Sequence, residues 1–463
     1  MKRLKQHSIW GRRGTFILAA TGSAVGLGNI WKFPYITGEN GGGAFVLMYL
    51  ICVVLVGAPI MTAEILIGRR GRANPIMAMQ NVSRESGRFR GWNIIGWLGV
   101  SAAFLILSYY SVIAGWTLEY LSLAINQGFA DFDGSTSGAV FDDLLANKSQ
   151  LAQWQTIFVA MTALVLVFGV NKGLELAVRI MMPLLFLLLL LLLGYAAYAG
   201  DFLAGLKFLF SFNVGDLSWR AALVALGHAF FTLSLGMGCI MAYGAYMPSS
   251  ASIGKTVITV ALLDTTVALV AGLAIFPLVF ATPGISPGEG PGLMFVTLPV
   301  VFGSIPLGAW FGGLFFLLVV VAAWSSTISL LEPAVAYFTE RFGFHRISAC
   351  LLIAGCAWLL GLCTVFSFND WSDLNLIGGM NFFELIDFVT TSIMLPLGGL
   401  LTAIFVGWFV KHDLLRQELH LDSRRFFQIW QWLLRYISPV AVLAIFIAGL
   451  YPFLITFFGS SDF

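Results

Sequence analysis

Long apolar runs follow one another along this chain, and short polar segments separate them. Most runs reach the roughly 20 residues that a helix needs to cross a bilayer. We count eleven of them, and each predicts a membrane-spanning helix: 14–37, 41–68, 95–126, 153–170, 174–199, 220–246, 253–282, 305–341, 347–367, 382–411 and 428–457. Several exceed a minimal span, so tilted or interrupted helices are expected.

Composition places the chain among membrane proteins that cross the bilayer many times. Of its 463 residues, 59% are hydrophobic and only 10% are charged, whereas soluble domains carry about 25% charged residues. An ATP-driven pump would need a soluble nucleotide-binding module, and no nucleotide loop, zinc signature or hydrolase motif is present. We therefore expect neither a primary pump nor an enzyme.

The distribution of basic residues predicts the orientation in the membrane, because cytoplasmic loops are enriched in Lys and Arg. With residues 1–13 as a cytoplasmic tail, 21 of the 25 Lys and Arg residues lie in cytoplasmic segments. The opposite side holds only Lys148, Lys207 and Arg220, and Lys32 lies within a span. No small-residue cleavage site follows the tail, so it is not expected to be a signal peptide. Eleven helices then place the C-terminus outside the cell, with the protein in a bacterial cell membrane.

Two of the spans contain clusters of glycines and polar residues that should interrupt a helix. In the first span these are Gly22, Gly26, Gly28, Asn29 and Pro34, and the sixth span is interrupted within 227–238. Glycines also permit close helix packing. However, an interrupted helix persists in a membrane only where its freed backbone groups line a cavity and meet a ligand.

The two interruptions divide the chain into similar halves. Spans 1–5 (14–199) and spans 6–10 (220–411) each begin with a broken helix, and an eleventh helix (428–457) follows. This arrangement is typical of transporters built from inverted repeats.

Three segments resemble signatures of the neurotransmitter:sodium symporter family. They are Gly-Asn-Ile-Trp-Lys-Phe-Pro-Tyr at 28–35, Ala-Phe-Phe-Thr-Leu-Ser-Leu-Gly at 229–236, and Gly-Pro-Gly-Leu-Met-Phe-Val-Thr-Leu-Pro at 290–299. The chain looks most like the bacterial eleven-helix members that carry leucine or several hydrophobic amino acids. The resemblance implies an all-α polytopic membrane protein with a LeuT-type fold, which is a 5+5 inverted repeat with broken helices 1 and 6, plus helix 11. It also implies sodium-driven amino-acid uptake by alternating access.

The resemblance further implies two sodium sites, and sodium prefers oxygen ligands. The family pattern assigns to the first site the Ala24 carbonyl and the side chains of Asn29, Thr232 and Asp264. It assigns to the second site the carbonyls of Gly22, Val25 and Ala322 and the hydroxyls of Ser325 and Ser326.

Asp264 differs from the asparagine that is common in the family at this position. A carboxylate in the membrane is costly unless a cation accompanies it. Chloride-dependent relatives bind the anion partly through a serine one helical turn later, where this chain has Ala268. We therefore expect transport that does not need chloride. His228 replaces a family glutamine and leaves a proton-linked step open.

The resemblance also places a substrate pocket between the broken helices. The N–H groups of Leu27 and Gly28, with the Tyr110 hydroxyl, should bind the substrate carboxylate, because helix N-termini favour anions. Carbonyls near Ala24, Phe231 and Ser234 should accept from the amino group. The expected walls are Ile106, Phe231, Met237, Ser329 and Leu330. Because most of these walls are apolar, we expect a hydrophobic or aromatic L-amino acid.

Two gates should control access to this pocket. Outside, Lys32 should pair with Asp387 above a lid of Tyr110 and Phe231. Inside, Trp10 should plug the exit while Glu340 and Tyr246 hold the basic tail. The family's gating arginine corresponds to His7 here, so Lys5 or Arg3 would replace it.

Helix 5 carries Gly173 and Pro183, a spacing that marks a cytoplasmic unwinding in related bacterial proteins. An ordinary proline kink is the alternative explanation.

Two other functions fit the same sequence. One is a proton-coupled or exchange-type amino-acid carrier on this fold, and the other is an amino-acid sensor that does not transport. The expected partners are the amino acid and the lipid bilayer, without nucleic acid or an obligatory protein partner.

Overall fold

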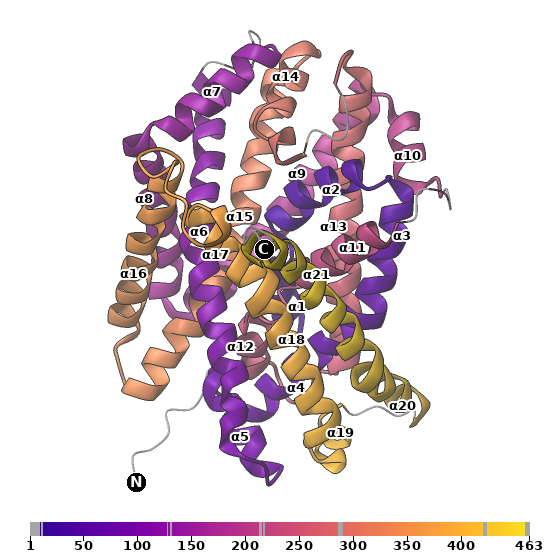
Figure 1. Ribbon diagram of the computed structural model, residues 1–463, viewed down its shortest axis with the longest axis vertical. Helices are drawn as coiled ribbons and strands as arrows, with labels where there is room; N and C mark the ends of the chain where they lie inside the picture. The colour runs from indigo at the N-terminus through magenta and orange to yellow at the C-terminus, as the bar shows by residue number, and fades with distance from the viewer. Residues whose placement is uncertain are drawn as a thin grey trace.

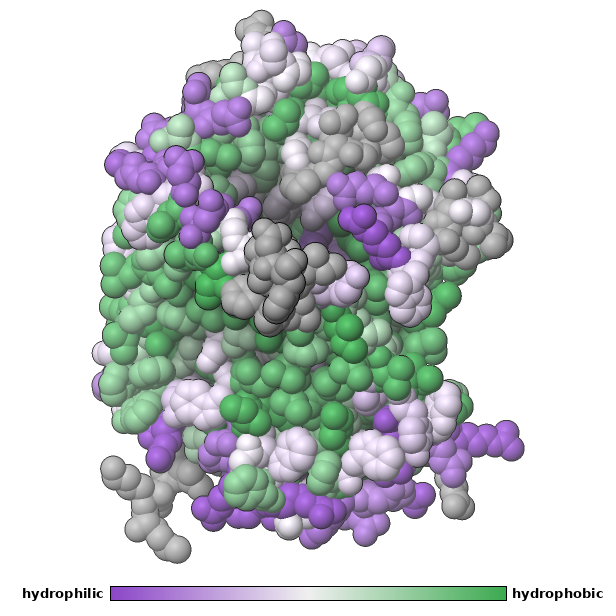
Figure 2. All heavy atoms as spheres, viewed as in Figure 1, coloured by the Kyte–Doolittle hydropathy of each residue, from purple (hydrophilic) through white to green (hydrophobic). Residues whose placement is uncertain are grey.

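The computed structural model describes residues 10, 13–126, 128–129, 132–212, 215, 218–285, 290–419 and 424–458. Within these residues the secondary structure is entirely helical. Hydrophobic residues form a broad band across the middle of the molecule and hydrophilic residues gather at both ends (Figure 2). This is the surface of a protein that spans a membrane several times.

Nine helices in the described part of the chain are long and apolar enough to cross a bilayer. They are Gly43–Gly71, Arg90–Asn126, Lys148–Val167, Val170–Ala199, Ile253–Ala281, Gly308–Phe342, Arg346–Ser367, Phe382–Phe409 and Arg425–Tyr451. The two other predicted spans are the interrupted ones, whose pieces are each too short to cross alone.

The first predicted span consists of α1 (Arg13–Ala24), the π-turn η1 (Gly28–Lys32) and α2 (Phe33–Glu39). The sixth consists of α11 (Trp219–Thr232) and α12 (Cys239–Tyr246). Between α11 and α12 the backbone enters the left-handed region, with φ of +53° at Ser234, +76° at Gly236 and +72° at Gly238. Both interruptions therefore occur where the glycine clusters predict them.

The remaining helices surround these two. Two long ones, α6 (Ile94–Asn126) and α15 (Gly308–Phe342), pack along each other beside the breaks. The others are α3 (Gly43–Cys52), η2 (Val53–Gly57), α4 (Ala58–Gly71), α8 (Lys148–Val167), η4 (Val170–Leu174), α9 (Glu175–Ala199), α13 (Ile253–Ala281), α16 (Arg346–Ser367), α17 (Phe382–Asp387), η8 (Phe388–Met394), α18 (Leu395–Ile404), η9 (Phe405–Phe409), η10 (Leu433–Ile437) and α21 (Ser438–Phe458).

Short helices cover the two ends of the bundle (Figure 1). One end carries α7 (Gly134–Ala146), α10 (Phe202–Phe210), η6 (Gly290–Leu293), α14 (Thr297–Ser304) and η7 (Ile377–Gly379). The opposite end carries α5 (Pro75–Glu85), η3 (Arg90–Asn93), α19 (His412–Leu419) and α20 (Arg424–Trp432). An aspartate cap begins α7. Asp133 accepts hydrogen bonds from the Thr136 N–H, from the hydroxyls of Ser135 and Thr136 and from the Ser135 N–H, and these bonds lower its pKa to about 2.

The unwinding expected in helix 5 is absent from this structure. Residues 170–199 form one continuous helix, which contains both Gly173 in η4 and Pro183 in α9. The Met182 side chain packs against Gly22 of α1, 3.2 Å from where a Cβ of that glycine would lie. Residues 170–199 are therefore wound in the conformation described here, and unwinding at Gly173 and Pro183 stays a prediction.

Candidate functional site

The two interruptions contact each other at the centre of the bundle. The Ser234 hydroxyl donates to the Ser23 carbonyl at 2.8 Å, and the Ser23 hydroxyl lies 3.3 Å from that of Ser234. The N–H of Gly236 donates to Glu64 Oε1 of α4 at 2.8 Å. Side chains thus satisfy some of the backbone groups that the breaks release.

The predicted first sodium site has its side chains gathered around one buried carboxylate. Asp264 Oδ1 accepts from Asn29 Nδ2 at 2.8 Å and from the Thr232 hydroxyl at 3.0 Å. The Tyr49 hydroxyl donates to Oδ2 at 3.1 Å. Asp264 is completely buried and no Lys or Arg within the described ranges forms an ion pair with it. A buried carboxylate surrounded only by neutral donors is suited to an added monovalent cation.

The predicted second sodium site is neutral. The Ser325 hydroxyl donates to the Ala322 carbonyl at 2.9 Å and lies 3.4 Å from the Val25 carbonyl of the first break. Ser326 faces the other way, and a Cβ added to Gly26 would collide with its hydroxyl. The structure therefore brings three of the five predicted ligands into direct contact and turns Ser326 toward the neighbouring cavity.

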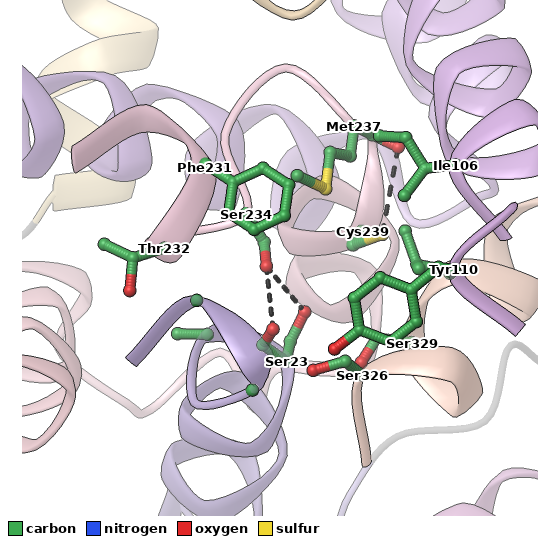
Figure 3. A pocket seen from close by; sticks show the side chains of 14 residues that line it. Ser23, Ile106, Tyr110, Phe231, Thr232, Ser234, Met237, Cys239, Ser326 and Ser329 are labelled. Atoms are coloured by element: carbon green, nitrogen blue, oxygen red, sulfur yellow. Dashed lines mark hydrogen bonds between the residues drawn. The ribbon is translucent and has the colours of Figure 1, made fainter. Parts of the chain in front are cut away.

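That cavity lies between the two breaks, α6 and α15 (Figure 3). Its volume is about 30 Å³, which leaves room for water-sized occupants. Nine of the ten predicted substrate residues line it: Ala24, Gly28, Ile106, Tyr110, Phe231, Ser234, Met237, Ser329 and Leu330. The tenth, Leu27, donates its N–H to the Tyr110 hydroxyl at 3.2 Å.

Sequence reasoning missed several residues at this centre. Ser23 and Cys239 also line the cavity. Tyr49 binds Asp264, and Glu64 binds the broken sixth helix. Glu64 could have been found, because an acidic residue within an apolar span is a functional candidate by default. Tyr49 gave no such signal, since an aromatic residue in an apolar run is ordinary.

A second, larger cavity of about 390 Å³ lies on the other side of Tyr110 and Phe231, which line both cavities. Lys32 and Asp387 both line it, but they do not form the predicted ion pair. Lys32 Nζ instead lies 4.8 Å from the centre of the Phe231 ring. Because the two charges line the same cavity without pairing, the predicted outer gate is not closed in this conformation.

The opposite side of the small cavity is tightly packed. Trp10 is 1% exposed, and its backbone N–H donates to the Tyr246 carbonyl at 3.0 Å. Its ring packs against Phe16, Tyr243 and Tyr246 at 5.4–5.8 Å. This position is consistent with the predicted plug.

Among the described residues, the two predicted anchors of the tail, Tyr246 and Glu340, have the following partners. The Tyr246 hydroxyl donates to Glu332, which forms an ion pair with Arg346 at 2.5 Å. Glu340 accepts from the N–H and the side chain of Asn74 at 2.7 and 2.8 Å. Sequence reasoning did not anticipate the Glu332–Arg346 pair. His7, Lys5 and Arg3 lie outside the described residues.

Comparisons with known proteins give a consistent result. The model of the Sodium:neurotransmitter symporter family matches residues 7–133 and 143–459. An uncharacterized sodium-dependent transporter of Bacillus subtilis (strain 168) is 37% identical over 95% of this chain and 96% of its own length. One of Haemophilus influenzae is 30% identical over 96% of this chain and 99% of its own length. The crystal structure of MhsT in complex with L-phenylalanine superimposes with a TM-score of 0.87, at 42% identity, over 96% of this chain and 99% of that one.

Proposed function

This chain belongs to the Sodium:neurotransmitter symporter family, and from that premise we propose that it imports hydrophobic or aromatic L-amino acids together with sodium. It is a sodium-dependent membrane transporter with a LeuT-type fold and not an enzyme. MhsT, its structural match, was crystallised with L-phenylalanine, and the cavity here has a largely apolar wall next to the released backbone groups.

One observation carries the proposal. A buried carboxylate without a cationic partner among the described residues, Asp264, adjoins both broken helices and lies near the substrate cavity. A sodium ion bound there would neutralise the carboxylate and hold Asn29 and Thr232 in place. Binding of the ion would thereby shape the cavity for the amino acid, and by linkage the amino acid would strengthen binding of the ion.

We further propose two ions per cycle, one at Asp264 and one at Ser325. The basic end of the chain would face the cytoplasm of a bacterial cell, with the C-terminus outside. The excess of Lys and Arg in the segments assigned to the cytoplasm supports this orientation.

The decisive experiment measures L-phenylalanine binding to the purified protein in sodium, potassium and choline chloride. If two sodium sites are coupled to the substrate, the affinity for L-phenylalanine should be at least about tenfold higher in sodium, a difference of about 1.4 kcal/mol. The dependence of binding on sodium concentration should have a Hill coefficient above one. Sodium-gradient-driven uptake into proteoliposomes then separates a carrier from a sensor, since a sensor would bind without accumulation. Equal affinity in all three salts would refute sodium coupling.

A further inference from the structure

The end of the molecule that carries α19 and α20 has an exposed aromatic cluster arranged around an arginine. Trp408, Trp432 and Tyr436 are 50%, 54% and 47% exposed. Tyr436 lies between the other two rings, with centroid distances of 5.6 Å to Trp408 and 6.3 Å to Trp432. Arg435 lies over the Trp408 ring at 5.4 Å. We call these four residues the Arg435 cluster.

A backbone carbonyl holds the Arg435 guanidinium in place. Its Nε donates to the Gly407 carbonyl at 2.5 Å, at the end of helix segment η9. Gly407 permits this approach, because a Cβ there would lie 3.0 Å from the arginine Cγ. The contact uses Nε only, so the terminal nitrogens remain available to an anion. Arginine presents such nitrogens as a planar fork that matches a phosphate.

No carboxylate in the described ranges pairs with Arg435. Two acids at this end are engaged elsewhere, since Glu418 pairs with Arg69 and Arg70 and Glu85 pairs with Arg70. A third, Asp413 of α19, is exposed and forms no ion pair with a described residue. A second guanidinium, that of Arg88, donates to the adjacent Phe409 carbonyl at 3.0 Å. The surface around η9 (Phe405–Phe409) therefore has an excess of positive charge.

The location of the cluster indicates what lies against it. In the most hydrophobic stretch of the helix Arg425–Tyr451, only 17% of the residues are buried inside the protein, so most of this helix surface faces the lipid. Trp and Tyr concentrate where acyl chains meet headgroups. An arginine among them at that depth meets the phosphate layer of one leaflet.

We propose that the Arg435 cluster is a binding site for an anionic phospholipid. The phosphodiester would accept hydrogen bonds from the free guanidinium nitrogens, and the rings of Trp408, Trp432 and Tyr436 would enclose the glycerol region. A zwitterionic lipid would bind less well because its own ammonium competes for the phosphate and adds repulsion from Arg435 and Arg88.

The test compares stabilisation of the detergent-purified full chain by phosphatidylglycerol and phosphatidylcholine. The protein should respond to phosphatidylglycerol at about tenfold lower concentration, the scale of one charge-assisted contact. Arg435→Gln should bring the ratio near one, while Arg435→Lys should retain part of the preference. Lys255→Gln, which removes an exposed charge at another helix start, is the matched control and should keep the full ratio.

Sodium-dependent L-phenylalanine binding by each variant reports whether it is folded. Native mass spectrometry gives an independent count of bound lipid if a variant is too unstable for melting curves. Equal potency of the two lipids on the unmodified protein would overturn the proposal, as would a preference that survives Arg435→Gln. A dimer that dissociates in Arg435→Gln without a change in lipid preference would assign the surface to a second copy of the chain and also overturn it.

Discussion

The two proposed sodium sites lie against the same broken helix but are built from different chemistry. Around Asp264, three side chains from three separate segments donate to one carboxylate. Around Ser325, one hydroxyl faces two backbone carbonyls, and these three groups are neutral. A charged site holds its ion mainly by attraction, whereas a neutral site depends on backbone carbonyls that converge only in certain conformations. The first site should thus be sensitive to side-chain chemistry and the second to the state of the helices.

The largest effect is expected from Asp264→Asn, which removes the charge of the first sodium site and keeps the shape of the side chain. Loss of charge-assisted contacts worth about 1.5–3 kcal/mol should raise the sodium concentration for half-maximal L-phenylalanine binding by about 10- to 100-fold. A sodium titration of ligand binding measures this change. Asp413→Asn, an exposed acid on α19, is the control and should have no effect. The unmodified protein should transport equally in chloride and gluconate, and a chloride requirement would remove the compensating role from Asp264.

Tyr110→Phe tests whether the substrate connects the two sites. The Tyr110 hydroxyl accepts from the Leu27 N–H beside the first break and lines the small cavity. Its loss should weaken binding of every accepted amino acid by about tenfold, since a carboxylate contact is shared by all of them. Competition binding with a panel of amino acids measures the factor for each. A loss confined to one side-chain class would place Tyr110 against the side chain instead. Tyr198→Phe, an exposed tyrosine, is the control.

Ser325→Ala should have a smaller effect than either change. It deletes one neutral ligand, worth about 1 kcal/mol, and should raise the sodium requirement about fivefold. Ser304→Ala removes a hydroxyl that donates to a carbonyl of its own helix, and should leave the sodium requirement unchanged. An effect of Ser325→Ala as large as that of Asp264→Asn would show that the two sites do not differ as described.

The smallest effect is expected at the outer gate, where the charges are solvated rather than buried. Lys32→Ala and Asp387→Ala should each lower uptake about threefold while sodium binding survives. The double variant should be less impaired than the product of the two losses, with a coupling of about 0.5–1 kcal/mol. Uptake rates in proteoliposomes, measured for the unmodified protein and the three variants, give the coupling between the two charges. Strict additivity would mean that the two charges do not meet during transport.

The fold was largely predictable because its signals are local. A run of about 20 apolar residues is visible without any knowledge of its neighbours, and glycine clusters mark both breaks. Asn29, Thr232 and Asp264 could be assigned together from the family pattern, and the structure brings them into contact. Their roles as sodium ligands remain predictions.

Other parts of the site depend on information that the sequence does not display. Adjacent residues on a helix point about 100° apart. In this structure Ser325 faces the Val25 carbonyl and Ser326 faces the small cavity, a difference that the sequence does not specify. The separation of Lys32 from Asp387 and the winding of residues 170–199 depend on the conformation of the carrier. Tyr49 reaches Asp264 from another helix, a contact that only the packed structure specifies.

A fixed carboxylate at Asp264 has an electrical consequence for the transport cycle. With two sodium ions and a zwitterionic substrate, the loaded carrier would have a local charge of +1, and the empty carrier would have −1. Membrane voltage, worth about 2.3 kcal/mol per charge per 100 mV, would then drive the loaded carrier inward and the empty carrier outward. If Asp264 instead returns protonated, each cycle exports one proton, and internal acidification should accelerate the return. Current and internal pH recorded together during uptake would distinguish the two modes of return.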